Sequence, residues 1–106
     1  MKILVTGAAG FIGFNFCELL MQSTKYKIVG IDNLNDYYDV NLKKKRLHIL
    51  KKYKNFFFSK IDINDNSSLE RIFKKNKFDF VLNLAAQAGV RYSIQEPRKY
   101  VESNIS

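Results

Sequence analysis

Short apolar runs alternate with longer amphipathic segments along this chain. Apolar runs of about four to eight residues bounded by turn residues are typical of buried strands, whereas apolar residues recurring every three or four positions indicate helices. Runs of the first kind predict strands at 2–7, 26–32, 55–62 and 78–86. Segments of the second kind predict helices at 12–23, 43–54 and 64–75, and a turn followed by a helix within 93–106.

The order of these elements is βαβαβαβα, which predicts the fold class. Strands that are apolar on both faces and alternate with helices indicate a parallel sheet covered on both sides. We therefore expect an α/β fold, the N-terminal part of a Rossmann-type doubly wound sheet, with residues 1–106 in one domain. A four-stranded beginning of such a sheet would leave an edge strand unpaired, so we expect a longer protein.

The expected helices have identifiable faces and ends. In the first helix the apolar face is Phe16, Leu19 and Leu20. Near the third helix, Ser67 and Glu70 have the spacing of a capping box, and Pro97 suits the first turn of the last helix. The apolar side of the lysine-rich helix is expected to hold Leu42, Ile49, Leu50 and Tyr53. Its lysines would then cover a solvated face.

Composition narrows the function classes. Hydrophobic residues make up 46% of the chain, enough for a packed core, and the single cysteine, Cys17, excludes an intrachain disulfide or a thiolate metal cluster. We expect a reducing, cytoplasmic environment, no metal site, and no membrane partner because no apolar run reaches a spanning length. Small residues interrupt the apolar start, which argues against a secretory signal. We expect Cys17 in the core and His48 at the surface.

The net charge of +8 raises the question of a nucleic-acid partner. Much of the excess lies in the lysine-rich helix at 43–54, and lysine, asparagine and isoleucine are abundant throughout the chain. A solvated face in a protein of lysine-rich composition accounts for this charge. We therefore expect no nucleic-acid partner, although a basic nucleic-acid-binding domain stays open as an alternative.

Three glycines, Gly7, Gly10 and Gly13, lie where the first strand gives way to the first helix. Glycine weakens a helix start, so a compensating role is expected. Gly7 would allow a tight turn, Gly10 would let a diphosphate approach the backbone, and Gly13 would let the helix pack closely. Backbone N–H groups of Phe11 and Ile12 and the helix dipole would then face the phosphates. The G-x-x-G-x-x-G spacing is one residue longer than the usual dinucleotide fingerprint.

Acidic residues end two of the expected strands. Asp32 lies 19 residues after Gly13, where a carboxylate can accept hydrogen bonds from the adenosine ribose and would repel a 2′-phosphate. This favours NAD over NADP. Asp62 could accept from the adenine amino group with Ile63 beside the ring, although a turn or helix-cap role explains Asp62 equally well. Small residues at 84–89 would let a cofactor lie along the fourth strand end.

The motifs "VTGAAGFIG", "GIDNLNDYYD", "DIND" and "LAAQAGVRYS" together resemble the extended short-chain dehydrogenase/reductases that act on nucleotide sugars, an epimerase/dehydratase family. The resemblance covers essentially the whole chain and the front third or so of such an enzyme. Where many relatives carry histidine, this chain has Asn83, which we expect to alter local hydrogen bonding. The resemblance implies an NAD site formed by Gly7, Gly10, Phe11, Ile12, Gly13, Asp32, Asn33, Asp62, Ile63, Leu84, Ala85, Ala86, Gln87, Ala88 and Asn104.

The resemblance also implies a reaction. In the 4-epimerases of this family, tightly held NAD oxidises C4 of the sugar, the keto sugar turns, and hydride returns to the opposite face. A Tyr-x-x-x-Lys pair supplies the base, and no tyrosine of this chain has a lysine four residues later. We therefore expect no catalytic residue here and no turnover by this chain alone. The implied partners are a nucleotide-sugar substrate, such as a UDP-sugar, and a second subunit in a homodimer. Arg91 follows the cofactor loop and could bind the substrate's carboxylate or diphosphate, although a surface or structural ion pair explains Arg91 equally well.

Two further functions stay open besides the 4-epimerase. A nucleotide-sugar 4,6-dehydratase would share the same cofactor half-site. A non-catalytic dinucleotide-binding module would naturally lack the tyrosine and lysine.

Overall fold

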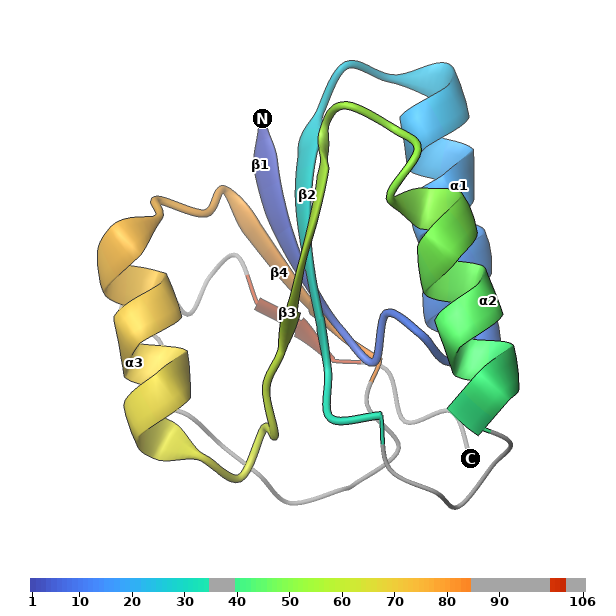
Figure 1. Cartoon of the computed structure of the whole chain (residues 1–106). Helices are drawn as coiled ribbons and strands as arrows, with labels where there is room; N and C mark the ends of the chain where they lie inside the picture. The colour runs from blue at the N-terminus through green and yellow to red at the C-terminus, as the bar shows by residue number, and fades with distance from the viewer. Residues whose placement is uncertain (35–39, 85–99, 103–106) are drawn as a thin grey trace.

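A computed structural model of the chain describes residues 1–34, 40–84 and 100–102. It contains a parallel sheet with helices between the strands (Figure 1). The strands are β1 (Lys2–Thr6), β2 (Lys27–Asp32), β3 (Phe56–Lys60), β4 (Phe80–Asn83) and β5 (Tyr100–Glu102). The helices are α1 (Phe11–Ser23), α2 (Val40–Leu50) and α3 (Asn66–Lys75).

The strand order is β3-β2-β1-β4-β5, with every neighbouring pair parallel. The chain moves outward from β1 to β3, then crosses back to place β4 on the other side of β1. This reversal between β1 and β4 is the topological switch point of a doubly wound sheet. The predicted Rossmann-type α/β class is therefore confirmed.

Helices cover both faces of the sheet, with α1 and α2 on one face and α3 on the other (Figure 1). Two apolar clusters fill the layers, as expected for strands apolar on both sides. The first joins Ile3, Val5 and Ile28 to buried residues of α1 and α2, and the second joins Leu4 and Val29 to buried residues of α3. Alternate residues of β1 thus enter opposite layers, as the period of a strand requires.

The buried stripe of α1 differs from the predicted face. Gly13, Cys17 and Met21 are buried at helical spacing, while Leu19 is 60% exposed. The side of α1 that carries Gly13 lies against the loop before the helix. Cys17 and Met21 follow Gly13 at helical spacing, so they are buried on that side. Cys17 is buried as predicted, and desolvation raises the pKa of its thiol to about 12.

The buried face of α2 was also predicted incorrectly in part. Lys43, Leu47 and Leu50 are buried, whereas Leu42 and Ile49 are exposed. The lysines do not all lie on a solvated face, because Lys43 has a buried carboxylate partner. His48 is exposed, as predicted.

The N-terminal cap of α3 is Asp65, not Ser67 of the predicted capping box. The Asp65 carboxylate accepts from Ser68 twice, from the hydroxyl at 2.8 Å and from the backbone N–H at 3.2 Å. These hydrogen bonds, the hydroxyl's first, lower the pKa of Asp65 from its ordinary value of 3.8. Aspartate and serine cap about equally well, and the side chain that accepts from the Ser68 N–H here is that of Asp65.

Replacing the observed cap should therefore matter more than replacing the predicted one. We expect Asp65→Ala to lower the urea midpoint of unfolding and Ser67→Ala to leave it nearly unchanged. Because the folded-state pKa of Asp65 is lowered, its contribution is present above pH 3.8 and is lost as the pH falls further. Equal midpoints for the two variants at pH 7 would contradict this assignment.

Tyr100–Glu102 form a strand where a helix was predicted. β5 pairs with β4 in parallel, with Val81 opposite Tyr100 and Asn83 opposite Glu102. The open N–H and C=O groups along β4 offer hydrogen bonds that a local helical pattern does not reveal. The edge of β4 expected to be unpaired is consequently covered. The rest of the predicted helix, including Pro97, lies outside the described residues.

None of the helices within the described ranges is long and apolar enough to cross a membrane. The same part of the chain contains no group of three or more potential metal ligands.

Candidate functional site

The carboxyl ends of the strands bring the predicted site residues to one edge of the sheet. Thr6, Asp32, Lys60 and Asn83 are the last residues of β1, β2, β3 and β4. Parallel pairing places all four at the lower edge in Figure 1. Ligands of open α/β sheets bind at this edge, at the switch point between β1 and β4.

The glycine loop makes a tight turn between β1 and α1. Gly7 has a φ of 70°, a conformation that favours glycine, and the Gly10 N–H donates to the Gly7 carbonyl at 3.1 Å. A Cβ on Gly13 would lie 2.2 Å from the same carbonyl oxygen. The predicted turn at Gly7 is confirmed, and Gly13 is required by the approach of α1 to its own loop.

The N-terminus of α1 presents backbone donors to this edge. The first helical hydrogen bond runs from the Phe14 N–H to the Gly10 carbonyl at 2.9 Å. The N–H groups of Phe11, Ile12 and Gly13 precede that bond and have no acceptor within the helix. Gly10 supplies no side-chain cap, and no acidic residue lies in the first turn. The positive end of the helix dipole is thus not neutralised by the helix itself.

Asp32 is 5% exposed and lies beside the glycine loop. Its Oδ2 accepts from the Ala9 N–H at 3.1 Å, and its Oδ1 accepts from the Leu34 N–H at 2.8 Å. The Ala8 N–H donates to the Ile31 carbonyl at 3.1 Å. The loop and the end of β2 are therefore held together by hydrogen bonds of backbone and side chain.

Two residues of α2 join this arrangement that the sequence analysis missed. The Lys43 Nζ lies 3.3 Å from Asp32 Oδ1, with both side chains almost fully buried. Arg46, one turn further along, donates from Nη1 to the Ala9 carbonyl at 3.1 Å, and its guanidinium lies 5.8 Å from the Phe11 ring centroid. Helical spacing from Leu47 and Leu50 back to Lys43 could have signalled a buried lysine.

Asn83 ties β4 to β1. Its Oδ1 accepts from the Thr6 hydroxyl, and the Leu84 N–H donates to Thr6 Oγ1 at 3.1 Å. Leu84 also donates to the Thr6 carbonyl at 3.2 Å. The expected effect of Asn83 on local hydrogen bonding fits these contacts at the switch point.

Asp62 and Ile63 follow β3 and are placed differently from each other. Asp62 is exposed, and its Oδ1 accepts from the Asn64 N–H at 2.8 Å, which is the turn role considered above. Ile63 is 8% exposed and belongs to the cluster under α3. Their contacts with adenine stay predictions.

The remaining predicted site residues are only partly described. Asn33 is half-buried and follows Asp32 directly, and Leu84 is half-buried beside Thr6. The others lie outside the described residues, namely Ala85, Ala86, Gln87, Ala88, Arg91 and Asn104.

The observed edge fits a dinucleotide. A diphosphate needs free N–H donors and a positive dipole end, which the start of α1 offers. Beside it lies the Asp32 carboxylate, whose Oδ2 accepts one hydrogen bond, from the Ala9 N–H, and so keeps the capacity for a second. Asp32 is held by three donors, so its orientation is set before any ligand binds.

Comparison with known proteins agrees with this geometry. The family described as GDP-mannose 4,6 dehydratase matches residues 4–106. A UDP-glucuronate 4-epimerase of Thermodesulfobacterium geofontis is 50% identical over 103 residues, which are 97% of this chain and 32% of that protein. The chain thus spans about a third of the length of this curated relative.

Solved structures of other proteins are similar to this chain in fold and in sequence. The crystal structure of UDP-glucuronic acid 4-epimerase from Bacillus cereus, in complex with UDP-glucuronic acid and NAD, superimposes with a TM-score of 0.72 at 38% identity, covering 94% of this chain and 31% of that one. The dTDP-glucose 4,6-dehydratase of Bacillus anthracis in complex with NAD gives 0.71 at 35% identity, covering 83% and 27%. By sequence and by fold, the chain belongs to the NAD-dependent epimerase/dehydratase family.

Proposed function

We propose that this chain is the NAD-binding part of a nucleotide-sugar 4-epimerase, with residues 1–106 in one dinucleotide-binding domain. One observation supports it most: the unneutralised start of α1 and the buried carboxylate of Asp32 lie side by side at the carboxyl edge of the sheet. The N–H groups of Phe11 and Ile12 bind the diphosphate in this proposal. Asp32 accepts from the adenosine ribose, and Asn33, Asp62, Ile63 and Leu84 border the adenosine.

The proposed substrate is UDP-glucuronate. The supporting finding is the 50% identity to the epimerase from Thermodesulfobacterium geofontis, together with the Bacillus cereus complex that holds UDP-glucuronic acid. Bound NAD would supply reversible oxidation at C4 of the sugar. The part of this chain in that reaction is to hold and orient the dinucleotide, while Ala85 to Ala88 and Asn104 border it and Arg91 contacts the substrate anion.

A 4,6-dehydratase is the second candidate. It is favoured by the description of the matching family and by the Bacillus anthracis structure. Both enzymes would use the cofactor site in the same way. Incubation of the protein that carries this chain, and not of the 106 residues alone, with UDP-glucuronate and with dTDP-glucose, followed by NMR of the products, distinguishes a C4 epimer from a 4-keto-6-deoxy sugar.

We expect the 106-residue chain to bind NAD and to epimerise nothing. The glycine loop and Asp32 provide the binding contacts, but no Tyr-x-x-x-Lys pair occurs in the sequence to move the proton at the sugar. Calorimetry with NAD measures the first expectation, and NMR of UDP-glucuronate after prolonged incubation measures the second. Robust turnover would contradict the proposed division of roles.

The same material tests the remaining alternatives. Salt-sensitive binding to DNA or RNA without NAD binding would favour the basic nucleic-acid-binding domain. NAD binding with no sugar chemistry by the protein that carries this chain would favour a non-catalytic module.

A cytoplasmic homodimer that acts on UDP-sugars is the form in which we propose the enzyme works.

A further inference from the structure

The Asp32 carboxylate at the end of β2 already has hydrogen-bond partners within the protein. Three hydrogen bonds already reach its carboxylate, one at Oδ2 from Ala9 and two at Oδ1 from Leu34 and Lys43. A carboxylate has about four acceptor sites, so the open one is on Oδ2. A ribose hydroxyl bound there would lie within a few ångströms of the Lys43 ammonium.

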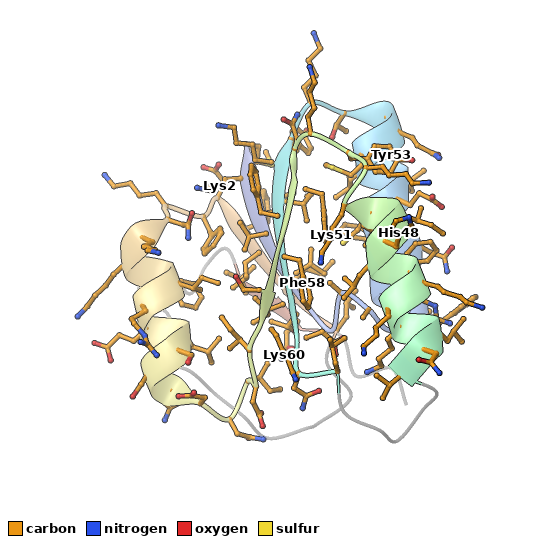
Figure 2. All side chains as sticks on the ribbon, viewed as in Figure 1. Lys2, His48, Lys51, Tyr53, Phe58 and Lys60 are labelled. Carbon is orange, nitrogen blue, oxygen red and sulfur yellow. The ribbon has the colours of Figure 1, made fainter. Side chains whose placement is uncertain are left out.

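A second lysine, Lys60, lies on the same face of the sheet as Asp32. Lys60 is the register partner of Asp32 across the β2–β3 pair, so the two side chains leave the sheet on the same face. Phe58, two residues earlier, projects from β3 toward α2, and the Nζ of Lys51, in the turn just after α2, lies 5.6 Å from its ring centroid (Figure 2). Lys60 therefore leaves the sheet on the face that α2 covers, the face on which Lys43 contacts Asp32. Lys60 is exposed at the lower end of β3 (Figure 2).

From this placement we infer that Lys43 and Lys60 determine how the site reads the 2′ position of the cofactor's adenosine. The inference rests on the proposed dinucleotide site. A lone carboxylate at this position repels a 2′-phosphate strongly. Here the Lys43 ammonium neutralises that carboxylate, and Lys60 adds a second positive charge beside it. The site keeps its preference for NAD but tolerates a 2′-phosphomonoester, so NADP also binds.

Coulomb's law predicts that the two lysines affect the binding of a 2′-phosphate more than that of a 2′-hydroxyl. The interaction of an ammonium with a phosphate dianion grows with both charges and falls with distance, and salt weakens it less for the buried Lys43 than for the exposed Lys60. The uncharged 2′-hydroxyl of NAD feels the same lysines far less. Removal of either lysine should therefore weaken NADP binding more than NAD binding.

The test measures the dissociation constants of NAD and NADP by calorimetry, on the full wild-type chain and on each variant. We expect wild type to bind NADP within about a hundredfold of NAD. Lys43→Met, which replaces the ammonium with an apolar chain of similar length, should raise the NADP to NAD ratio at least tenfold. Lys60→Met should raise it severalfold, and Lys43→Arg should leave it near the wild-type value.

Lys44→Met is the matched control. Lys44 is exposed on α2 next to Lys43, so its removal changes the net charge equally without touching Asp32. Its ratio should stay at the wild-type value. If Lys43→Met fails to fold, Lys60→Met carries the test, because its side chain is exposed.

Each contrary outcome has a distinct meaning. An unchanged ratio in Lys43→Met and Lys60→Met overturns the inference, because equal weakening of both cofactors marks a purely structural role. An NADP dissociation constant more than about a hundredfold above that of NAD in wild type overturns it as well. Failure of wild type to bind either dinucleotide refutes the proposed function itself.

Discussion

Gly13→Ala should destabilise the protein by about 2 kcal/mol, although alanine is the better helix former by roughly 1 kcal/mol. The new Cβ would lie 2.2 Å from the Gly7 carbonyl oxygen, 2.9 Å from the Gly7 carbonyl carbon and 3.0 Å from Ala8 Cα. All three are backbone atoms, so the conflict cannot be relieved by rotating a side chain. Urea unfolding measures the change in stability.

The same substitution should weaken NAD binding at least tenfold. Displacement of the loop moves the N–H groups of α1 away from the position of the diphosphate. Asn15→Ala is the control, because Asn15 is exposed two residues further along the same helix. It should leave NAD affinity unchanged. A Gly13→Ala protein as stable as wild type would show that the approach of α1 to the loop is not tight.

Asp32→Ala should be the other severe change. It removes the acceptor for the Ala9 and Leu34 N–H groups and leaves the Lys43 ammonium buried without its carboxylate. Breaking one side of a buried ion pair costs about 3–5 kcal/mol. We also expect NAD binding to fall below detection, because the proposed ribose acceptor is gone.

A double variant separates the two effects. Asp32→Asn combined with Lys43→Met removes both charges and should recover most of the stability lost in Asp32→Ala. It should not recover NAD binding. Asp62→Ala is the control, since Asp62 is an exposed carboxylate at the end of the next strand and should change the unfolding midpoint little. Full NAD affinity in the double variant would refute the role of Asp32.

The predictions that succeeded rest on local rules. Short apolar runs bounded by turn residues predict strands, so β1, β2, β3 and β4 were found with errors only at their ends. Glycines between a strand and a helix, with an aspartate at the end of the next strand, placed the loop beside Asp32. Both rules depend on spacing along the chain.

Two of the failures have different causes. Asp65, and not Ser67, caps α3, and its partner Ser68 lies only three residues further along the chain, so this error is a local one. The strand at Tyr100–Glu102 depended on an open edge of β4 that only the assembled sheet provides. Its partner lies far away in the sequence, and no local pattern reveals such a partner.

Lys43 is the clearest case of the same limit. In the sequence it is one lysine in a run of basic residues, and its neighbours Lys44 and Lys45 are exposed. The rotation of α2 that buries Leu47 and Leu50 also carries Lys43 inward to Asp32.

The amino-acid sequence by itself determined the parallel sheet, the glycine turn and the acidic residue at the end of β2, because hydrophobic period and backbone freedom act within a few residues. The tertiary structure alone decided that Lys43 contacts that carboxylate, that Arg46 contacts that turn and that Lys60 lies opposite Asp32 in the sheet. Helix rotation and strand register are settled by packing over the whole sheet, so no local pattern specifies which charges meet.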